Sequence, residues 1–402
     1  MDRADVIILG GGLVGLTLAL ALDRHGLSSI VVDPLDPKPA VASGHDGRAT
    51  AVSSSSWRMF QAIGVADRLD GQGCPIAAIK VSDGLEPGGL EFVPGAEDGP
   101  LGIMFENRRL RSALREAAEA AANVELRTPA SVGDVVRDGA GVRVALTDGR
   151  LIQAPLLAGA EGRNSPTREA AGIRLARWSY DHSAIIVTVA HERPHDNIAY
   201  EIFYPAGPFA VLPLLPGTRS AIVWSVPARD AAAILDLPDR ALAAEIEKRM
   251  GGFLGALQLA GGRSSYRLGF HHAAKIVGER LALVGDAAHG IHPIAGQGLN
   301  LGLRDAAALT EVLVEGARIG LDLGDTQLLA RYERWRSLDT LMVAAATDGL
   351  TRLYGIPGRA ASLIRRLGMG AVQRFGPLKS FLMAEARGEN GDLPLLLRGL
   401  TI

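Results

Sequence analysis

Val6-Ile-Ile-Leu-Gly10-Gly-Gly12-Leu-Val-Gly15 opens the chain and decides its fold. The apolar run before the glycines predicts a buried strand over 5–9, and the residues after them predict a helix over 16–25. A second strand is expected over 29–32, directly before Asp33. Strand, glycine turn, helix, strand and acidic residue in this order are typical of a dinucleotide-binding βαβ unit.

Each glycine of the motif has its own physical task. The first allows the tight turn, the second lets the backbone approach a pyrophosphate, and the third lets the helix pack against the strand. The acidic side chain after the second strand reaches an adenosine ribose hydroxyl. This motif leaves FAD and NAD open, and its candidate cofactor residues are Gly10, Gly12, Leu13, Val14, Gly15 and Asp33.

A second segment narrows the choice to a flavin. An apolar run from Leu281 ends in Gly285-Asp286, and a loop rich in proline and glycine then leads to a predicted helix. The carboxylate can accept hydrogen bonds from ribityl hydroxyls, while the helix N-terminus favours negative charge on the pyrimidine edge of the reduced ring. We expect the loop beside the ring to include Pro293, Gly296, Gln297 and Gly298, followed by Leu299 and Asn300.

Three shorter stretches add candidate residues. Arg48 follows the first βαβ unit and could neutralise a pyrophosphate or steer a nicotinamide nucleotide, although a solvated loop arginine is the alternative. Asn107 and Arg108 head a predicted helix over 109–122, where they could contact the ribityl or phosphate region. Glu161-Gly162 follows a strand predicted over 151–158 and opens a stretch rich in anion-binding groups that ends at Arg168.

Length and periodicity predict two domains and an extension. The chain has 402 residues, more than a single core usually supports. Short strands with turn signals between 183 and 227 predict an antiparallel sheet inserted into the α/β nucleotide fold. We assign the FAD-binding domain to 1–75, 101–178 and 269–330, the substrate domain to 76–100 and 179–268, and a C-terminal helical region to 331–402.

Composition excludes several classes of function. A net charge of −2 and 5% aromatic residues argue against a nucleic-acid surface. The single cysteine, Cys74, excludes an internal disulfide and favours a buried structural thiol. His289 and His292 have metal-like spacing but lack a third ligand, so we predict no metal. Without a signal peptide or an apolar run of ~18 residues, a cytoplasmic location is expected.

These residues together resemble the single-component, FAD-dependent aromatic hydroxylases of the para-hydroxybenzoate hydroxylase type. The glycine motif matches at residues 10–15, and the Gly-Asp motif matches at 285–286 with Pro293 and Gly298. The Asp-Gly motif matches only approximately, because Glu161 replaces the aspartate that the family uses for both FAD and NAD(P)H. The fold implied is a Rossmann-like FAD domain with an inserted antiparallel substrate sheet.

Within that superfamily the chain is most similar to the ubiquinone-biosynthesis hydroxylases. The supporting stretches are 48–53, 106–108, 207–214, 285–302, 332–336, 347–350 and 391–399. The resemblance implies that NADH or NADPH reduces FAD and that a flavin C4a-hydroperoxide formed with dioxygen hydroxylates a lipophilic, prenylated phenol. A hydroxylase of small soluble aromatics and a redox-silent FAD-binding subunit of a biosynthetic complex stay open, as does an oligomer.

The sequence offers two further candidates outside these motifs. By alternation Tyr200, Ile202 and Tyr204 share one face of the inserted sheet, with Phe209 and Trp224 nearby, and they either cover the flavin or form plain core. The residues after Thr351 carry eight Arg and Lys against three acidic residues. This tail either touches the inner membrane or other ubiquinone-biosynthesis proteins, or is a solvated helix face.

Overall fold

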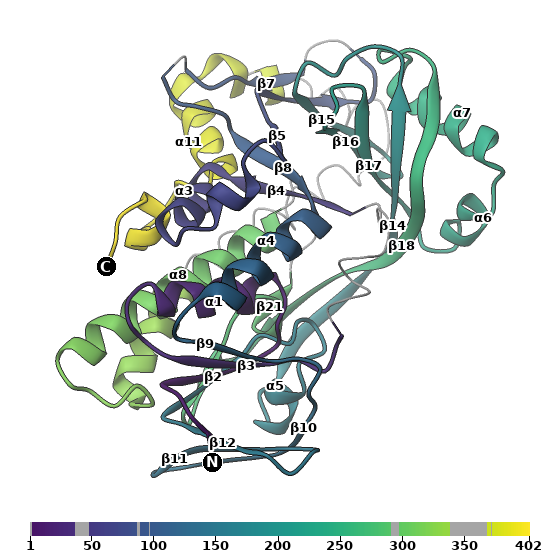
Figure 1. Cartoon of the computed structure of the whole chain (residues 1–402). Helices are drawn as coiled ribbons and strands as arrows, with labels where there is room; N and C mark the ends of the chain where they lie inside the picture. Colours follow the sequence, from purple (N-terminus) through teal and green to yellow (C-terminus); the bar gives the residue numbers. More distant parts are fainter. Residues whose placement is uncertain are drawn as a thin grey trace.

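The computed structural model describes residues 2–36, 48–86, 89–95, 97–290, 297–337, 368–370 and 372–402. Its nucleotide-binding half is built on a six-stranded sheet (Figure 1). The five strands after the first are parallel. In spatial order the strands are β19 (Val277–Gly278), β20 (Leu281–Leu283), β13 (Leu156–Gly159), β2 (Val6–Leu9), β3 (Ser29–Val32) and β9 (Val124–Arg127).

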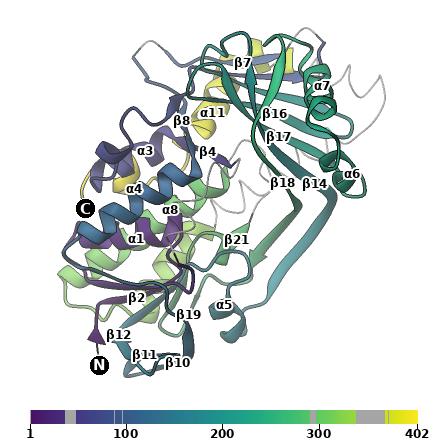
Figure 2. The same cartoon turned by 45° about the vertical axis from the view of Figure 1, so that its right-hand side comes forward.

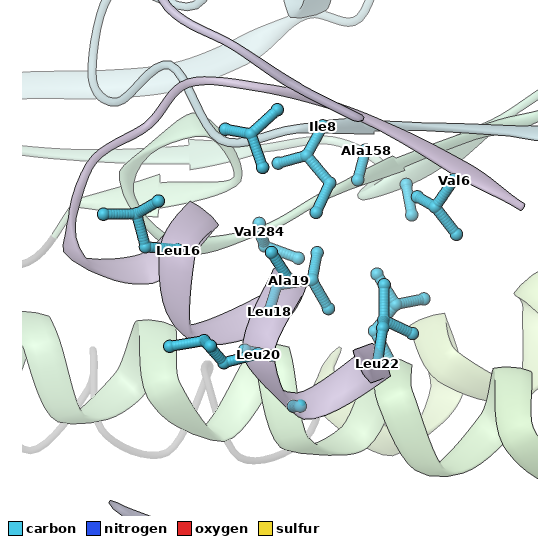
Figure 3. Packing of buried hydrophobic residues seen from close by; sticks show 14 of the residues in the cluster. Val6, Ile8, Leu16, Leu18, Ala19, Leu20, Leu22, Ala158 and Val284 are labelled. Atoms are coloured by element: carbon cyan, nitrogen blue, oxygen red, sulfur yellow. The ribbon is translucent and has the colours of Figure 1, made fainter. Parts of the chain in front are cut away.

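Three neighbouring helices cover one face of this sheet: α1 (Leu13–Asp23), α4 (Asn107–Ala120) and α8 (Gln297–Arg318). Figure 3 shows Val6, Ile8 and Ala158 of the strands packed near Leu18 and Leu22 of α1. All of these side chains are fully buried. The central strands β2, β13 and β20 carry no polar side chain because helices and a second sheet cover both faces of the parallel sheet.

The second sheet has four strands: β1 (Asp2–Arg3), β12 (Leu151–Ala154), β11 (Gly141–Leu146) and β10 (Val132–Asp138). The single strand predicted over 151–158 is therefore wrong, because β12 and β13 belong to different sheets. Pro155 lies in a bend between them and cannot donate a ladder hydrogen bond.

The substrate half is an eight-stranded sheet (Figure 2). It is antiparallel except that β6 and β15 run parallel. In spatial order its strands are β21 (His289–Gly290), β18 (Leu257–Ala273), β14 (Leu175–His191), β17 (Arg219–Pro227), β16 (Gly207–Leu214), β15 (Ile198–Tyr204), β6 (Ala78–Asp83) and β7 (Leu90–Phe92). The 17-residue strands β14 and β18 run through positions 178 and 268, so domain limits placed there divide continuous strands.

Helices α6 (Ala231–Leu235) and α7 (Asp239–Met250) lie against the outer face of this sheet (Figure 1). Ile202, Phe209 and Trp224 pack there with residues of α7, and Tyr200 and Tyr204 border the same cluster. The plain-core interpretation of these five side chains is therefore confirmed. The opposite surface of the sheet, here called the inner face, carries Ile79, Val81, Ala199, Leu212 and Ala221.

A three-stranded sheet joins the two halves: β4 (Ala49–Ser53), β8 (Gly102–Glu106) and β5 (Cys74–Pro75). Beside it lie α3 (Ser54–Ala62) and the C-terminal α11 (Gly376–Ala386). Cys74 is fully buried, as predicted, and burial raises its pKa to about 11. Among the helices in the described ranges, none has the length and hydropathy needed to cross a bilayer.

Candidate functional site

The predicted motifs meet at one edge of the parallel sheet. Asp33 follows β3, the glycine loop follows β2, Glu161 comes two residues after β13, and Gly285 comes two residues after β20. These four strands are neighbours and run parallel, so all their carboxyl ends lie at the same edge. Open α/β sheets bind their ligands at this edge.

The glycine loop leaves no room for side chains at two positions. Gly10 has φ +108°, and a Cβ there would lie 2.4 Å from the carbonyl oxygen of Ala160. A Cβ at Gly15 would lie 2.0 Å from the carbonyl oxygen of Gly10. By contrast, a Cβ at Gly12 would meet no atom within 4 Å, so the backbone is open to a ligand at this position.

The loop feeds α1, whose N-cap Gly12 has no capping side chain. The first amides of a helix lack intrahelical acceptors, and here they include those of Leu13 and Val14. Asp33 accepts a 2.6 Å hydrogen bond from the amide of Gly11, which fixes its carboxylate beside the loop. The arrangement suits a pyrophosphate next to a ribose.

The Gly-Asp segment lies against this first helix. Gly285 has φ +61°, and a Cβ on it would lie 3.2 Å from Val14 of α1. A Cβ on Gly302 of α8 would lie 2.7 Å from the same valine and 3.2 Å from the Cα of Gly285. Segments nearly three hundred residues apart in the sequence are thus packed backbone against side chain.

A buried carboxylate anchors the Gly-Asp segment to α8. Asp305 is fully buried and accepts the amide hydrogen of Gly285 at 2.9 Å. Its carboxylate also pairs with His289 at 2.6 Å and with Arg336 at 2.7 Å. Burial by itself would raise the pKa of Asp305, but His289 and Arg336 outweigh it, so the pKa lies below its ordinary value. The sequence motifs did not predict this buried carboxylate or its contacts.

Asp286 itself is exposed, so its carboxylate is accessible to a ligand. Its carbonyl oxygen accepts a 2.7 Å hydrogen bond from Nε2 of His271 on β18. Burial lowers the pKa of His271, which favours the neutral ring that donates this bond. The long strand of the substrate sheet therefore holds the flavin-motif loop in place.

The start of α8 is fastened to β4. The side-chain amide of Asn300 donates to the carbonyl of Ala51 at 2.9 Å and accepts from the amide of Ser53 at 3.0 Å. The structure thus gives Asn300 a positioning contact. Gly298 and Leu299 are partly buried in the first turn, Gln297 begins the helix, and Pro293 and Gly296 lie outside the described residues.

The two basic candidates differ in their surroundings. Arg48 is exposed next to β4, and its carbonyl accepts the amide hydrogen of Asn107 at 3.0 Å. Asn107 also accepts a 2.7 Å hydrogen bond from Thr50. Arg108 is part-exposed and pairs with Glu106 at 2.6 Å. These contacts bind the start of α4 to β4.

Glu161 faces the start of α5 (Pro166–Ala170). It accepts hydrogen bonds from the hydroxyl of Ser165 at 2.7 Å and from the amide of Thr167 at 3.2 Å, and the hydroxyl of Thr167 also donates to it. Its carboxylate therefore caps a short helix. Gly162 provides the turn at φ +81°.

Arg168 was grouped with anion-binding residues, and this interpretation is wrong. Its side chain is 1% exposed and donates to the carbonyls of Ala287 and Arg163, each at 3.0 Å. It ties the loop after β13 to the loop after β20. The position of Arg168 in the sequence motif did not predict that its guanidinium group would be buried.

Tyr266 of β18 is a site residue that sequence reasoning missed. It lies within electrostatic range of Arg48, Arg163 and Asp286, and burial raises its pKa. Its strand partner is Ala184, whose neighbour Ile185 packs in the outer core. Alternation therefore places Tyr266 on the inner face, next to the flavin motifs. Its strand lacks clear alternation of apolar residues, so the sequence did not predict which face of the sheet Tyr266 occupies.

These features fit FAD: open helix amides and Asp33 at one end, exposed Asp286 in the middle and the start of α8 at the other. Together they define a flavoprotein with a substrate sheet facing its cofactor site.

The comparisons with known proteins agree. A family model described as FAD binding domain matches residues 3–345. The ubiquinone hydroxylase UbiL of Rhodospirillum rubrum is 46% identical, covering 99% of this chain and 94% of that protein. The 3-demethoxyubiquinol 3-hydroxylase of Escherichia coli is 35% identical, covering 96% and 98%. The p-nitrophenol 4-monooxygenase PnpA of Pseudomonas putida shares the fold, with a TM-score of 0.80 at 19% identity over 97% of this chain and 99% of that one.

The chain belongs to the FAD-dependent hydroxylases of ubiquinone biosynthesis. It is an FAD-dependent monooxygenase, with NADH or NADPH as the reductant and dioxygen as co-substrate. The Rossmann-like fold with an inserted antiparallel sheet is confirmed.

Gly10→Ala should abolish or strongly weaken FAD binding. The added methyl group meets the carbonyl of Ala160 at 2.4 Å and forces an L residue into a glycine conformation. We expect FAD affinity to fall about tenfold or more, equivalent to ~1.4 kcal/mol, measured by flavin absorbance during titration. Gly217→Ala, which would meet no atom within 4 Å, is the control, and unchanged affinity in Gly10→Ala would contradict this view of the loop.

Asp305→Asn should destabilise the protein and release FAD. It removes the carboxylate that pairs with the buried Arg336, a loss of roughly 3–5 kcal/mol. Because the folded pKa is lowered, the carboxylate's stabilisation is present above the ordinary pKa of ~3.9 and is lost as pH falls below it. The melting temperature at neutral pH should drop in this variant but not in Asp67→Asn, whose side chain is exposed. Equal melting temperatures would refute the anchor.

Proposed function

We propose that this protein hydroxylates the aromatic ring of a prenylated phenol during ubiquinone biosynthesis. The observation that carries the proposal is the convergence of both flavin motifs at one sheet edge, in a chain that matches ubiquinone hydroxylases over nearly its whole length. When bound, FAD supplies the chemistry that takes electrons from NAD(P)H and activates dioxygen. The protein's own residues bind the cofactor, orient the phenol and exclude water.

In this proposal each motif holds one part of FAD. Gly12, Leu13 and Val14 offer backbone amides to the pyrophosphate, and Asp33 accepts from the adenosine ribose. Asp286 accepts from the ribityl chain. The first turn of α8, including Gly298 and Leu299, faces the pyrimidine edge.

Further groups of the proposed site hold the loops or bear charge near them. Gly10, Gly15 and Gly285 permit the close packing, and Asn107, Arg108, Gly162 and Asn300 hold the surrounding loops. Arg48 adds positive charge beside the site. Glu161 is occupied in capping α5, so we do not assign it a direct contact with nicotinamide.

The apolar residues of the inner face favour the proposal that the substrate is lipophilic. Its cluster combines Ala199 and Ala221 of the large sheet with Met104 of β8, and Leu382 and Met383 of α11 pack against them. Such a surface excludes water, which would otherwise divert reducing equivalents to hydrogen peroxide. It also matches the apolar body of a prenylated ring better than a small carboxylated aromatic.

We further propose that α11 contacts the membrane that holds such a substrate. Phe375, Leu378 and Phe381 are spaced three residues apart and are 60%, 39% and 49% exposed. Arg374 beside them is exposed and basic, while the opposite side of α11 packs on the inner-face cluster. An exposed apolar stripe with adjacent positive charge is typical of peripheral attachment to anionic lipid.

Purified holoenzyme should oxidise NADH or NADPH in the presence of a short-chain prenylphenol. We expect one oxygen atom of isotopically labelled dioxygen in the product, detected by mass spectrometry, because a monooxygenase places a single atom on the ring. Salicylate-like acids serve as the comparison. Turnover of these acids alone would favour a catabolic hydroxylase, and a flavin that NAD(P)H never bleaches would favour a redox-silent subunit.

The double variant Phe375→Ser, Phe381→Ser should lose binding to anionic vesicles. Two exposed rings supply much of the apolar area available to the interface, so we expect the bound fraction to fall about tenfold. Co-sedimentation with phosphatidylglycerol and phosphatidylethanolamine vesicles measures it. Ile319→Ser removes another exposed apolar side chain, 75% exposed and remote from α11, and should change nothing. Equal binding by all three proteins would refute the proposal.

A further inference from the structure

Glu201 occupies an unexpected place in the substrate sheet. It lies in the middle of β15, where Tyr200 and Ile202 on either side turn outward into the core beneath α7. Because strand side chains alternate, Glu201 turns to the inner face together with Ala199. A carboxylate therefore stands in the apolar surface proposed to receive the substrate.

The neighbours of Glu201 do not satisfy its charge. Its strand partners are Val81 on β6 and Ala210 on β16. Within the described part of the chain, its carboxylate has neither a hydrogen-bond donor nor a cation. Desolvation is accordingly the cause that raises its pKa to about 7. Glu201 is partly buried, and withdrawing an unpaired carboxylate from water is costly, so a carboxylate that finds no partner among the described residues suggests a partner supplied by a ligand.

The inner face also leads toward the flavin motifs. Its cluster includes Ala49 and Ala51 of β4 at the edge. Ala51 in turn accepts the hydrogen bond from Asn300 in the first turn of α8. One short strand therefore connects the surface around Glu201 with the helix start assigned to the flavin ring.

We propose that Glu201 binds the phenolic hydroxyl of the aromatic substrate and accepts its proton, an inference that rests on the proposed function. The phenol O–H bond breaks, its electron pair stays on oxygen, and the proton forms the carboxylic acid of Glu201. The resulting phenolate donates electron density to the ring carbons ortho and para to it, which favours attack on electrophilic oxygen. The proton passes to water when the product leaves, so no additional reactant is needed.

The acidity of the carboxyl group suits this role. A base is most effective when its pKa approaches the working pH and the pKa of the group it deprotonates, ~10 for a phenol. An ordinary glutamate at ~4.3 is a much weaker base. Burial raises the pKa of Glu201 toward that of the phenol, and no second charged residue is needed for this shift.

Other ionisable groups border the inner face and must be separated from Glu201. Asp83 of β6 lies on the same side of its strand, and Arg219 of β17 pairs with Glu106. Tyr266 of β18 has a raised pKa and Cys74 of β5 a pKa of about 11. Among the described residues, histidines also lie on neighbouring strands: His182 on β14, His271 and His272 on β18, and His289 on β21.

The test compares wild-type holoenzyme with Glu201→Gln. The probe is a phenol whose own pKa is near the ordinary ~10 and whose phenolate has a distinct absorbance, so ionisation near pH ~7 reports on the bound state and not on the free phenol. Wild type should bind it as the phenolate above pH ~7 and hydroxylate prenylphenols faster as pH rises through that value. Glu201→Gln should bind the neutral phenol, lose this rise, and hydroxylate roughly 10²-fold more slowly, while its FAD content stays that of wild type. Tyr200→Phe, on the outer face of the same strand, is the matched control.

A second readout does not depend on turnover. A carboxyl group with a raised folded pKa loses stabilisation as pH climbs from ~4.3 to its folded value, so Glu201→Gln should gain melting temperature over wild type between pH ~5 and ~7.5. Phenolate binding and a pH–rate profile that are the same in both proteins would overturn the proposal. Absence of phenol hydroxylation by wild type, with the spectral shift intact, would instead refute the proposed function.

Discussion

The structure depends on how closely the glycine loop approaches the strand beside it. A methyl group on Gly10 or Gly15 would overlap a backbone carbonyl, and only glycine permits this approach. The close packing brings the carboxyl ends of β2 and β13 together and leaves Gly12 open. Every later feature of the site, from the exposed Asp286 to the start of α8, is placed relative to this edge.

A buried ionic network holds the distant half of the site against it. Asp305 binds the backbone of Gly285, the imidazole of His289 and the guanidinium of Arg336 without exposure to water. Arg168 supplies a second link between neighbouring loops through two carbonyls. Separating a buried charge from its partner is costly, so these ion pairs and hydrogen bonds favour the observed arrangement of the loops.

The sequence predicted the parts of the fold that follow from local pattern. β3 occurs at the expected residues and β2 within one residue of them, because apolar runs determine both strands. It could not predict which surface of β15 faces inward, since this depends on where α7 packs. For the same reason Glu201, Asp305 and Tyr266 were missed, and Arg168 was misinterpreted. Their roles depend on contacts between segments far apart in the chain.

Two long strands, β14 and β18, connect the cofactor half to the substrate half, and His271 on one of them holds the carbonyl of Asp286. Changes at the substrate sheet can therefore reach the flavin loop directly.

The most direct measurement of the central claim is a crystal structure of the protein with FAD. We expect the adenosine ribose at Asp33, the pyrophosphate at Gly12 and the ring at the first turn of α8. Density for FAD at any other place, or none with FAD in excess, would contradict the account.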